Sequence, residues 1–493
     1  MSLLLDADAH AVAPAAAAPA PSGRRARWRL PVGWPIAGAV AAYPVWWALG
    51  VTDLVLPVTA VVLLLQLLRR GRVRVPPGFW LWLLFLALVV LSAVMLNVTA
   101  PGTLPPSGTG RYIAYVVRLL DYVAVAVVML FIGNTTEREL PRLRVVTWMS
   151  LLAVWVVGLG LLSLALPRAA FTTPLSLVLP SSLSSALDAQ GGRVSLAQVQ
   201  PVLGVDAPRP AAPFVFTNSW GNVLSVLLVW VLVLAWAGGR RTRLATGLLV
   251  AASIVPIVYS LNRGMWIGLG LSLAYGAVRL AARGRLLAIG VLALVLGVGA
   301  VTFAASPLQT LVAERLGHGH SNDVRGSLAR DAVVAATNSP LLGYGTTRTV
   351  LGSEGSIAIG KSASCPKCGN FNIGSTGQIF LLLVAQGFLG MAVYVAYFLR
   401  TLWEYRRDAS PVGIAGSLVV VLSLFYAFFY TALLMPLLLT FVSIGLLWRN
   451  ATLRAADAAA LREGAPRPGT PRLGTTRFGT AQLGAPAPVR VRR

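Results

Sequence analysis

The sequence predicts an all-α protein, a polytopic transmembrane helical bundle of about twelve spans, and two observations lead to this fold class. Of the 493 residues, 56% are hydrophobic and 12% are charged, whereas charged residues make up about 25% of a typical soluble domain. Apolar runs of roughly 17–25 residues, the length that crosses about 30 Å of hydrocarbon, recur between Gly33 and Trp448. In lipid only helices and closed barrels satisfy their backbone, and long continuous runs favour helices.

The apolar runs define a transmembrane domain over residues 33–450. The flanking tails, 1–32 and 451–493, are expected to be disordered and cytoplasmic, because segments rich in Ala, Pro, Gly and Arg cannot bury a core. Two connections, about 167–215 and about 307–375, are long enough to carry function. The expected spans lie near 33–50, 54–68, 78–97, 112–133, 145–166, 216–237, 244–261, 264–280, 286–306, 376–399, 411–430 and 433–448.

The arginines set the expected orientation, because cytoplasmic loops carry an excess of basic residues. Twelve spans with both termini in the cytoplasm place every cluster on the inner side. The chain is therefore expected to be a multi-pass protein of the cytoplasmic membrane, with both long loops outside. The net charge of +25 is interpreted as contact with the lipid bilayer, not with nucleic acid. The clusters are 24–29, 69–74, 138–144, 240–243, 279–285 and 400–407.

Arg263 lies in a polar segment, Tyr259–Trp266, between two apolar runs at the expected outer boundary. One interpretation is an interfacial arginine whose side chain extends to the lipid head groups. The other is a phosphate ligand, because the planar guanidinium binds phosphate oxygens bidentately. The residue alone does not separate the two.

Arg118 and Asp121 are charged residues inside the fourth expected span. Their spacing of three places them on one helix face, and charges within a span are costly and usually face a polar cavity. They are either a structural ion pair or part of a substrate pathway. Arg111, two turns earlier, extends the basic face outward.

The second long loop contains two of the three histidines, His318 and His320, together with Arg325 and Arg330. A general base that works near neutral pH is most often a histidine or a carboxylate, so this loop is where a base is expected. The alternative is a solvated loop whose charges keep it soluble. A helix is expected from Asp323 to about Thr337.

Cys365 and Cys368 are the only cysteines, and both lie in the expected outer loop. In an oxidising compartment a local disulfide is the first interpretation. With His318 and His320 they would make a Cys2His2 zinc set, but the spacing matches no recognised finger. The prediction is a disulfide that holds the loop, with no metal and no cofactor.

Four stretches together resemble the bacterial O-antigen ligase and O-antigen polymerase family. The segment 262–266, Asn-Arg-Gly-Met-Trp, is similar to the family's Ser-Arg-Gly at the start of a span. Arg325 followed by Pro-Leu-Leu-Gly-Tyr-Gly at 340–345 is similar to its loop helix. Residues 213–218 resemble its Phe-x-Asn-Pro-Asn element, and 387–390 resemble its Gly-x-x-Gly. The resemblance covers roughly residues 210–400.

The resemblance implies a membrane glycosyltransferase of the C type that moves a polyprenyl-diphosphate-linked glycan to a hydroxyl of a glycan or glycolipid acceptor, without a metal. Arg263 and Arg325 would stabilise the leaving diphosphate. The position of the family's histidine is occupied by Thr376, which cannot act as an imidazole base. Either His318, His320 or a loop carboxylate would replace it, or the reaction needs no strong base. The residues expected to contact the substrates are Asn218, Asn262, Arg118, Asp121, Arg330, Thr376 and Gln378.

Two rival functions remain open at this stage. A transporter or flippase for a lipid-linked or amphipathic solute would share the spans and the charges at 118 and 121. Transporters often carry internal repeats and mid-membrane helix breaks, whereas here the polar residues concentrate at the outer boundary, which favours an enzyme. A scaffold without activity is the third interpretation, because of Thr376.

Overall fold

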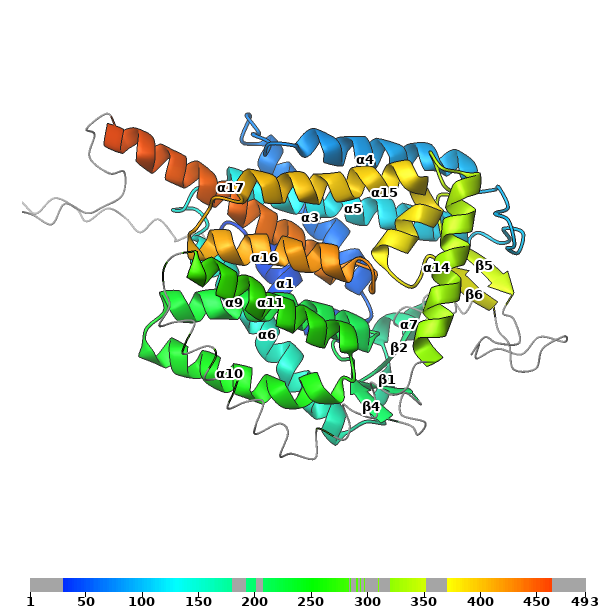
Figure 1. Ribbon diagram of the computed structural model, residues 1–493, viewed down its shortest axis with the longest axis horizontal. Coiled ribbons are helices and arrows are strands. Elements are labelled where there is room, and N and C mark those ends of the chain that lie inside the picture. The colour runs from blue at the N-terminus through cyan, green and yellow to red at the C-terminus, as the bar shows by residue number, and fades with distance from the viewer. Residues whose placement is uncertain are drawn as a thin grey trace, which may run out of the picture.

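The computed structural model describes residues 30–179, 192–200, 207–282, 320–351 and 370–462, with a few isolated positions between 284 and 309. Within these ranges the protein is mostly helical, and its long helices run roughly along the longest axis of the molecule (Figure 1). Three two-stranded sheets and the helices α7 and α14 gather at one end, which we call the loop end.

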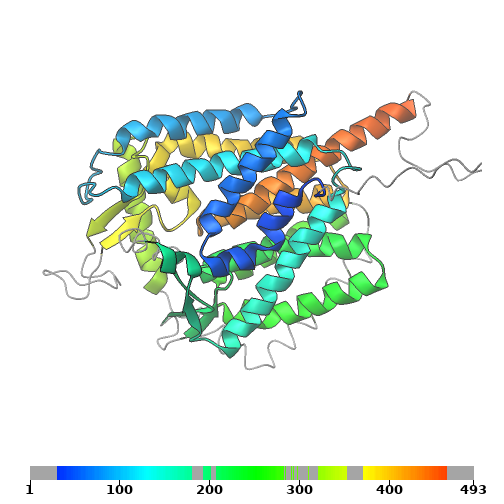
Figure 2. The ribbon, with the colours of Figure 1, turned by 180° about the vertical axis from the view of Figure 1, so that it is seen from behind.

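The first half of the bundle contains α1 (Trp34–Ala41), α2 (Tyr43–Leu49), α3 (Thr52–Leu68), α4 (Phe79–Leu91) with the 3-10 turn η1 (Ser92–Met95), α5 (Gly110–Asn134) and α6 (Arg142–Ala165). The second half contains α9 (Thr217–Ala237), α10 (Arg240–Tyr259), α11 (Arg263–Ala281), α15 (Gln378–Tyr405), α16 (Pro411–Tyr426) and α17 (Met435–Arg462). Seen from behind, α1, α2 and α3 cross the bundle over α5 and α6 (Figure 2).

Six of the described helices are long and apolar enough to cross a membrane by length and composition: α5, α6, α9, α10, α15 and α17. Three shorter apolar segments add to them, Thr52–Leu68, Phe79–Met95 and Pro411–Tyr426. The helical fold and its membrane character agree with the sequence prediction, but the count of about twelve spans is not confirmed. The expected span near 286–306 lies almost entirely outside the described residues.

The expected first span, 33–50, is two short helices rather than one. The chain breaks at Ala42, and α2 begins with Pro44 in its first turn. A proline has no amide hydrogen and its ring collides with the preceding helical turn, so the helix is interrupted where the hydrophobic pattern continues. Neither α1 nor α2 is long enough to cross the bilayer alone.

The two long loops differ from an all-helical expectation because they contain short antiparallel pairs. The first loop has β1 (Ala170–Thr172) with β2 (Arg193–Ser195), and β3 (Ala197–Gln200) with β4 (Ala207–Pro210), beside the short helix α7 (Pro174–Val178). The second has β5 (Arg348–Leu351) with β6 (Asn370–Ile373), after α14 (His320–Asn338). The helix expected from residue 323 therefore exists.

The C-terminal tail begins later than predicted. Helix α17 continues to Arg462, so residues 451–462 are helical and not disordered. Ala-rich sequence with alternating charges has high helix propensity, which the composition argument overlooked. Residues 1–29 and 463–493 lie outside the described residues.

The core of the bundle is aromatic where α4, α5, α15 and α17 meet. Trp82 is fully buried, and its ring lies 4.5 Å from that of Phe441 and 5.2 Å from that of Tyr397. Its indole nitrogen donates to the carbonyl of Tyr122. Close packing of large rings fixes the relative positions of these four helices, and they carry the start of α15 and the linker before α17.

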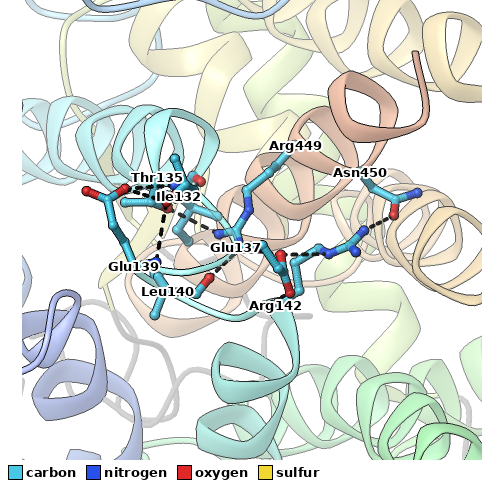
Figure 3. Close-up of polar contacts among 9 residues, drawn as sticks. Ile132, Thr135, Glu137, Glu139, Leu140, Arg142, Arg449 and Asn450 are labelled. Carbon is cyan, nitrogen blue, oxygen red and sulfur yellow. Dashed lines mark hydrogen bonds and ion pairs between the residues drawn. The ribbon is translucent and has the colours of Figure 1, made fainter. Parts of the chain in front are cut away.

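The end of the bundle opposite the loop end holds a network of paired charges, which we call the network end (Figure 3). Arg449 is only 3% exposed and binds Glu137 at 2.5 Å. Glu137 also accepts from the Arg142 side chain at 3.1 Å, and Arg142 donates to Asn450. Arg70 binds Glu139 at 3.1 Å. Each of these three arginines is therefore paired with a carboxylate.

Candidate functional site

Two arginines, Arg209 and Arg325, act electrostatically on Tyr430 at the loop end, and a third, Arg263, acts on Arg325. Arg209 comes from β4, Arg263 is the first residue of α11, and Arg325 lies in the second turn of α14. Burial lowers the pKa of Arg325, the phenol of Tyr430 raises it, and the charge of Arg263 lowers it again. Two guanidinium groups are therefore close enough to repel each other. We call Arg209, Arg263, Arg325 and Tyr430 the arginine cluster.

Tyr430 stands at the centre of this cluster and lies in the linker between α16 and α17. Burial raises the pKa of its phenol to about 12, although Arg325, a hydrogen bond with Asn262 and the charge of Arg209 oppose that rise. The hydroxyl donates to Oδ1 of Asn262. At neutral pH the phenol is protonated, so it acts as a donor and does not neutralise the arginines.

The start of α11 is fixed by its own sequence. The side chain of Asn262 accepts from the amide of Met265 at 3.1 Å and caps the helix, so that Arg263 emerges at the first turn. A Cβ on Gly264 would lie 2.2 Å from the Tyr430 hydroxyl, so only glycine allows this approach. The residues on both sides of Arg263 thus approach Tyr430 closely.

Asn262 also carries an unsatisfied donor, on the side of its amide that faces α9. It is 4% exposed, and its Nδ2 has no hydrogen-bond partner among the described residues. This amide packs against Gly221 of α9, where a Cβ would lie 2.7 Å away. One turn earlier, Oγ1 of Thr217 is buried and also lacks a partner within the described chain. Buried unsatisfied groups are rare and often mark a ligand site.

Arg209 was not anticipated from the sequence. It is 6% exposed, and its Nε donates to the carbonyl of Ser260 at 2.7 Å, which ties β4 to the end of α10. In the β3–β4 pair it stands opposite Gln198, whose side chain accepts from the amide of Thr217. No local motif distinguishes this arginine in its loop. Only the folding of the loop over the bundle brings it to Tyr430.

Among the residues predicted to contact substrate, the side chain of Gln378 makes hydrogen bonds within the bundle. It is fully buried, its Nε2 donates to the Tyr122 hydroxyl at 2.9 Å, and its Oε1 accepts from the amide of Ala432 at 3.0 Å. Its own amide donates to the carbonyl of Tyr430. Gln378 therefore joins the start of α15 to the linker that carries Tyr430. Two residues earlier, Oγ1 of Thr376 is buried without a partner in the described ranges.

Arg118 and Asp121 lie on one face of α5, as expected, but no ion pair is found between them, although both residues are described. Asp121 is 2% exposed, and its Oδ1 has no hydrogen-bond partner among the described residues. The Nε and Nη1 atoms of Arg118 are also buried and have no hydrogen-bond partner among the described residues. Asp53, in the first turn of α3, acts electrostatically on Asp121.

The other predicted residues have different positions. Asn218 is half-buried in the first turn of α9, beside Thr217, and Arg330 is exposed on α14. His320 is the first residue of α14, and its side chain lies outside the described part of the structure. His318, Cys365 and Cys368 lie outside the described residues altogether. Within the described ranges, no group of three or more His, Cys, Asp or Glu residues has metal-site geometry.

Two glycine motifs of the sequence meet in one joint that anchors α14. Helix α15 is interrupted at Gly387, whose φ of 69° and ψ of −171° are suited only to glycine. The segment after α14 docks there: the amides of Tyr344 and Gly345 donate to the carbonyls of Val384 and Ala385 at 2.8 Å. A Cβ on Gly387 would lie 2.5 Å from the carbonyl oxygen of Pro340. The joint fixes the helix that carries Arg325.

A second basic region lies beyond this joint, at the far side of the loop end. Arg348 is 4% exposed and donates to several backbone carbonyls, including those of Leu96 and Tyr344. Burial lowers its pKa, and the nearby charge of Arg111 lowers it further. Both arginines border a cavity of about 290 Å³ between residues 104–114 and the β5–β6 pair. Arg348 is a structural anchor, since its donors are satisfied by carbonyls.

Comparison with known proteins yields no match: no family model, no curated protein and no solved structure matches the chain. Its function is therefore argued from its own residues.

Proposed function

We propose that the protein is a membrane glycosyltransferase of the ligase or polymerase kind. It would transfer a glycan from a polyprenyl diphosphate to an acceptor hydroxyl at the outer face of the cytoplasmic membrane. In this proposal about twelve spans cross the bilayer, both termini are cytoplasmic, and the loop end faces outward. The arginine cluster binds the diphosphate of the donor.

The proximity of Arg263 and Arg325 is the observation that carries the proposal. Like charges in a partly desolvated place repel each other and lower the stability of the empty protein. An anion with several oxygens removes that cost, and the planar guanidinium binds such an anion through paired hydrogen bonds. The phenol of Tyr430 donates its proton to Asn262 and stays neutral, so it adds no negative charge that would balance the arginines. The arrangement suits a diphosphate.

The chemistry requires little more than charge stabilisation. When the bond between the sugar and the diphosphate breaks, negative charge develops on the leaving oxygen, and fixed cationic donors in a site of low dielectric constant stabilise it. Each such donor contributes a factor of about 10²–10³ in rate. The lipid-linked donor enters from the bilayer, and the cluster lies where the apolar helices end. No metal is part of the proposal.

A transporter of a lipid-linked solute is the second candidate, and the charges of Arg118 and Asp121 inside the bundle favour it. Charges within spans often mark a translocation pathway. The two candidates differ in what they release. The enzyme cleaves the donor and leaves polyprenyl diphosphate, whereas the transporter moves the intact donor from one leaflet to the other.

The test is reconstitution of the full chain in proteoliposomes that contain a polyprenyl-diphosphate-linked glycan and a hydroxyl-bearing glycan acceptor. The proposal predicts a larger acceptor and free polyprenyl diphosphate in equal amounts. Intact donor that only changes leaflet would favour the transporter instead.

Orientation is tested separately in intact cells by single cysteines at Ser327, which is exposed on α14, and at Ala456, which is exposed near the end of α17. Both are placed in a background without Cys365 and Cys368. A membrane-impermeant thiol reagent should label the first cysteine only. Labelling of the second cysteine alone would reverse the orientation and exclude an outward-facing site.

A further inference from the structure

Asp121 and Arg118 form a second polar site, and its level along the bundle follows from the position of Tyr122 on α5. Helix α5 begins at Gly110, twelve residues before Tyr122, so it extends about 18 Å beyond Tyr122 toward the loop end. The hydroxyl of Tyr122 accepts from the side chain of Gln378, the first residue of α15. Asp121 therefore lies at the level where α15 begins, not in the middle of the other helices.

Several neighbouring elements begin or end at this same level. Helix α3 begins at Thr52, next to Asp53, whose charge acts on both Asp121 and Tyr43. Tyr43, Thr52 and Leu434 line one small cavity, and Leu434 belongs to the linker that carries Tyr430. The carboxylates and the arginine cluster thus border the same linker from two sides.

Hydrogen bonds of Gln378 link residues that neighbour the two polar groups. Tyr122, adjacent to Asp121 in the sequence, is linked to Gln378. The amide of Gln378 donates to the carbonyl of Tyr430 at 2.9 Å, and the hydroxyl of Tyr430 donates to Asn262 beside Arg263. The fold therefore holds a cationic group and an acidic group in one layer, connected through Gln378.

The unsatisfied atoms of Arg118 and Asp121 indicate what would bind there. A buried carboxylate oxygen and buried guanidinium nitrogens, one helical turn apart and not paired with each other, leave one acceptor and two donors without partners. Removing such groups from water without compensation costs several kcal/mol. A sugar supplies the complement, because one hydroxyl donates to the carboxylate while a neighbouring hydroxyl accepts from the guanidinium.

We propose that Arg118 and Asp121 bind the acceptor sugar and that Asp121 is the catalytic base that takes the proton of the attacking hydroxyl. This inference rests on the proposed transferase function and extends it. It differs from the sequence interpretation, in which a histidine or carboxylate of the second long loop would be the base or no strong base would be needed. The groups that surround Asp121 are Asp53 from α3, Tyr43 from α2, and Arg118 and Tyr122 from α5.

The step is balanced without any other reactant. The proton of the acceptor hydroxyl passes to the carboxylate of Asp121, and the oxygen forms the new bond to the anomeric carbon of the donor sugar. The bond from that carbon to the diphosphate oxygen breaks with its electron pair, and Arg263 and Arg325 stabilise the resulting charge. Asp121 then releases its proton to water.

The test compares Asp121→Asn with wild type in the proteoliposome assay. General-base catalysis contributes about 10²–10⁴ in rate, so kcat should fall by a factor in that range. Binding of a fluorescent polyprenyl diphosphate, a probe of the arginine cluster, should be unchanged. The wild-type rate should decrease at acid pH as the base is protonated, and the remaining rate of the variant should lack this decrease.

Asp457→Asn is the matched control, because Asp457 is exposed near the end of α17, and it should behave like wild type. Asp121→Glu keeps a carboxylate, so its transfer rate should be lower than that of wild type but should still decrease at acid pH. This variant tests the proposal if Asp121→Asn does not fold. A wild-type kcat and pH profile in Asp121→Asn would overturn the proposal, and so would loss of donor binding together with transfer. If wild type binds the donor but transfers nothing, the transferase function itself fails.

Discussion

The arginines at the two ends of the bundle have different partners. At the network end, Arg449 and Arg142 share the carboxylate of Glu137, and Arg70 pairs with Glu139. At the loop end, Arg325 faces Arg263 and a protonated tyrosine. The same residue type is paired with carboxylates at one end and lies close to a second arginine at the other. Charged groups that the fold holds close together and desolvates mark the loop end as a candidate binding site.

The largest expected effect on stability is at the joint that fixes Arg325. Gly387→Ala introduces a Cβ at a backbone conformation that only glycine adopts readily, 2.5 Å from the carbonyl oxygen of Pro340. We expect a loss of about 3 kcal/mol or more in the free energy of unfolding. Thermal unfolding in detergent measures it. Gly326→Ala on α14, where a Cβ meets open space, should be neutral or stabilising. Equal losses of stability in both variants would contradict the structural role of the joint.

Charge removal should have opposite consequences at the two ends. Glu137→Gln leaves the buried guanidinium of Arg449 with weaker partners, and we expect a loss of about 2 kcal/mol. Arg325→Gln relieves repulsion, so the empty protein should keep its stability or gain slightly. The exposed pair of Arg400 and Glu404 supplies the control, since Glu404→Gln should cost less than about 1 kcal/mol. A destabilised Arg325→Gln variant would remove the contrast between the ends.

The pH dependence of stability should come from the network end. Hydrogen bonds from Arg142 and Arg449 hold the pKa of Glu137 below its usual value despite partial burial, and Arg70 and Thr136 do the same for Glu139. A carboxylate with a lowered folded pKa stabilises the protein above its unfolded pKa, about 4.3 for glutamate. That stability is lost as the pH falls through the lower folded value. The melting temperature should therefore drop below about pH 4.5, and less so in Glu137→Gln.

The sequence predicted the helices well and their boundaries less well, for identifiable reasons. Apolar runs identify α5, α6 and α15 because hydrophobic length is a local property. The break before Pro44 and the helical extension of α17 depend on backbone geometry and propensity, which hydropathy does not measure. The strands of the two long loops carry little local signal.

For the candidate site, the sequence identified the parts but not their arrangement. It singled out Arg263 and Arg325, which the fold brings within electrostatic reach of each other. It missed Arg209 and Asp53, which have no motif and acquire a role only when distant elements meet. It placed Gln378 among the substrate contacts, whereas its side chain joins Tyr122 to the linker before α17.

The most direct test of the account is to replace arginine by lysine at Arg325 and Arg263, with Arg142→Lys at the network end as the matched control. Lysine keeps the charge but loses the planar fork. If the arginine cluster grips a diphosphate, Arg325→Lys and Arg263→Lys should each lower glycan transfer about 10²–10³-fold, nearly as much as alanine. Arg142→Lys should lower stability and leave transfer per folded molecule unchanged. Near-normal transfer by both loop-end lysine variants would contradict the diphosphate site.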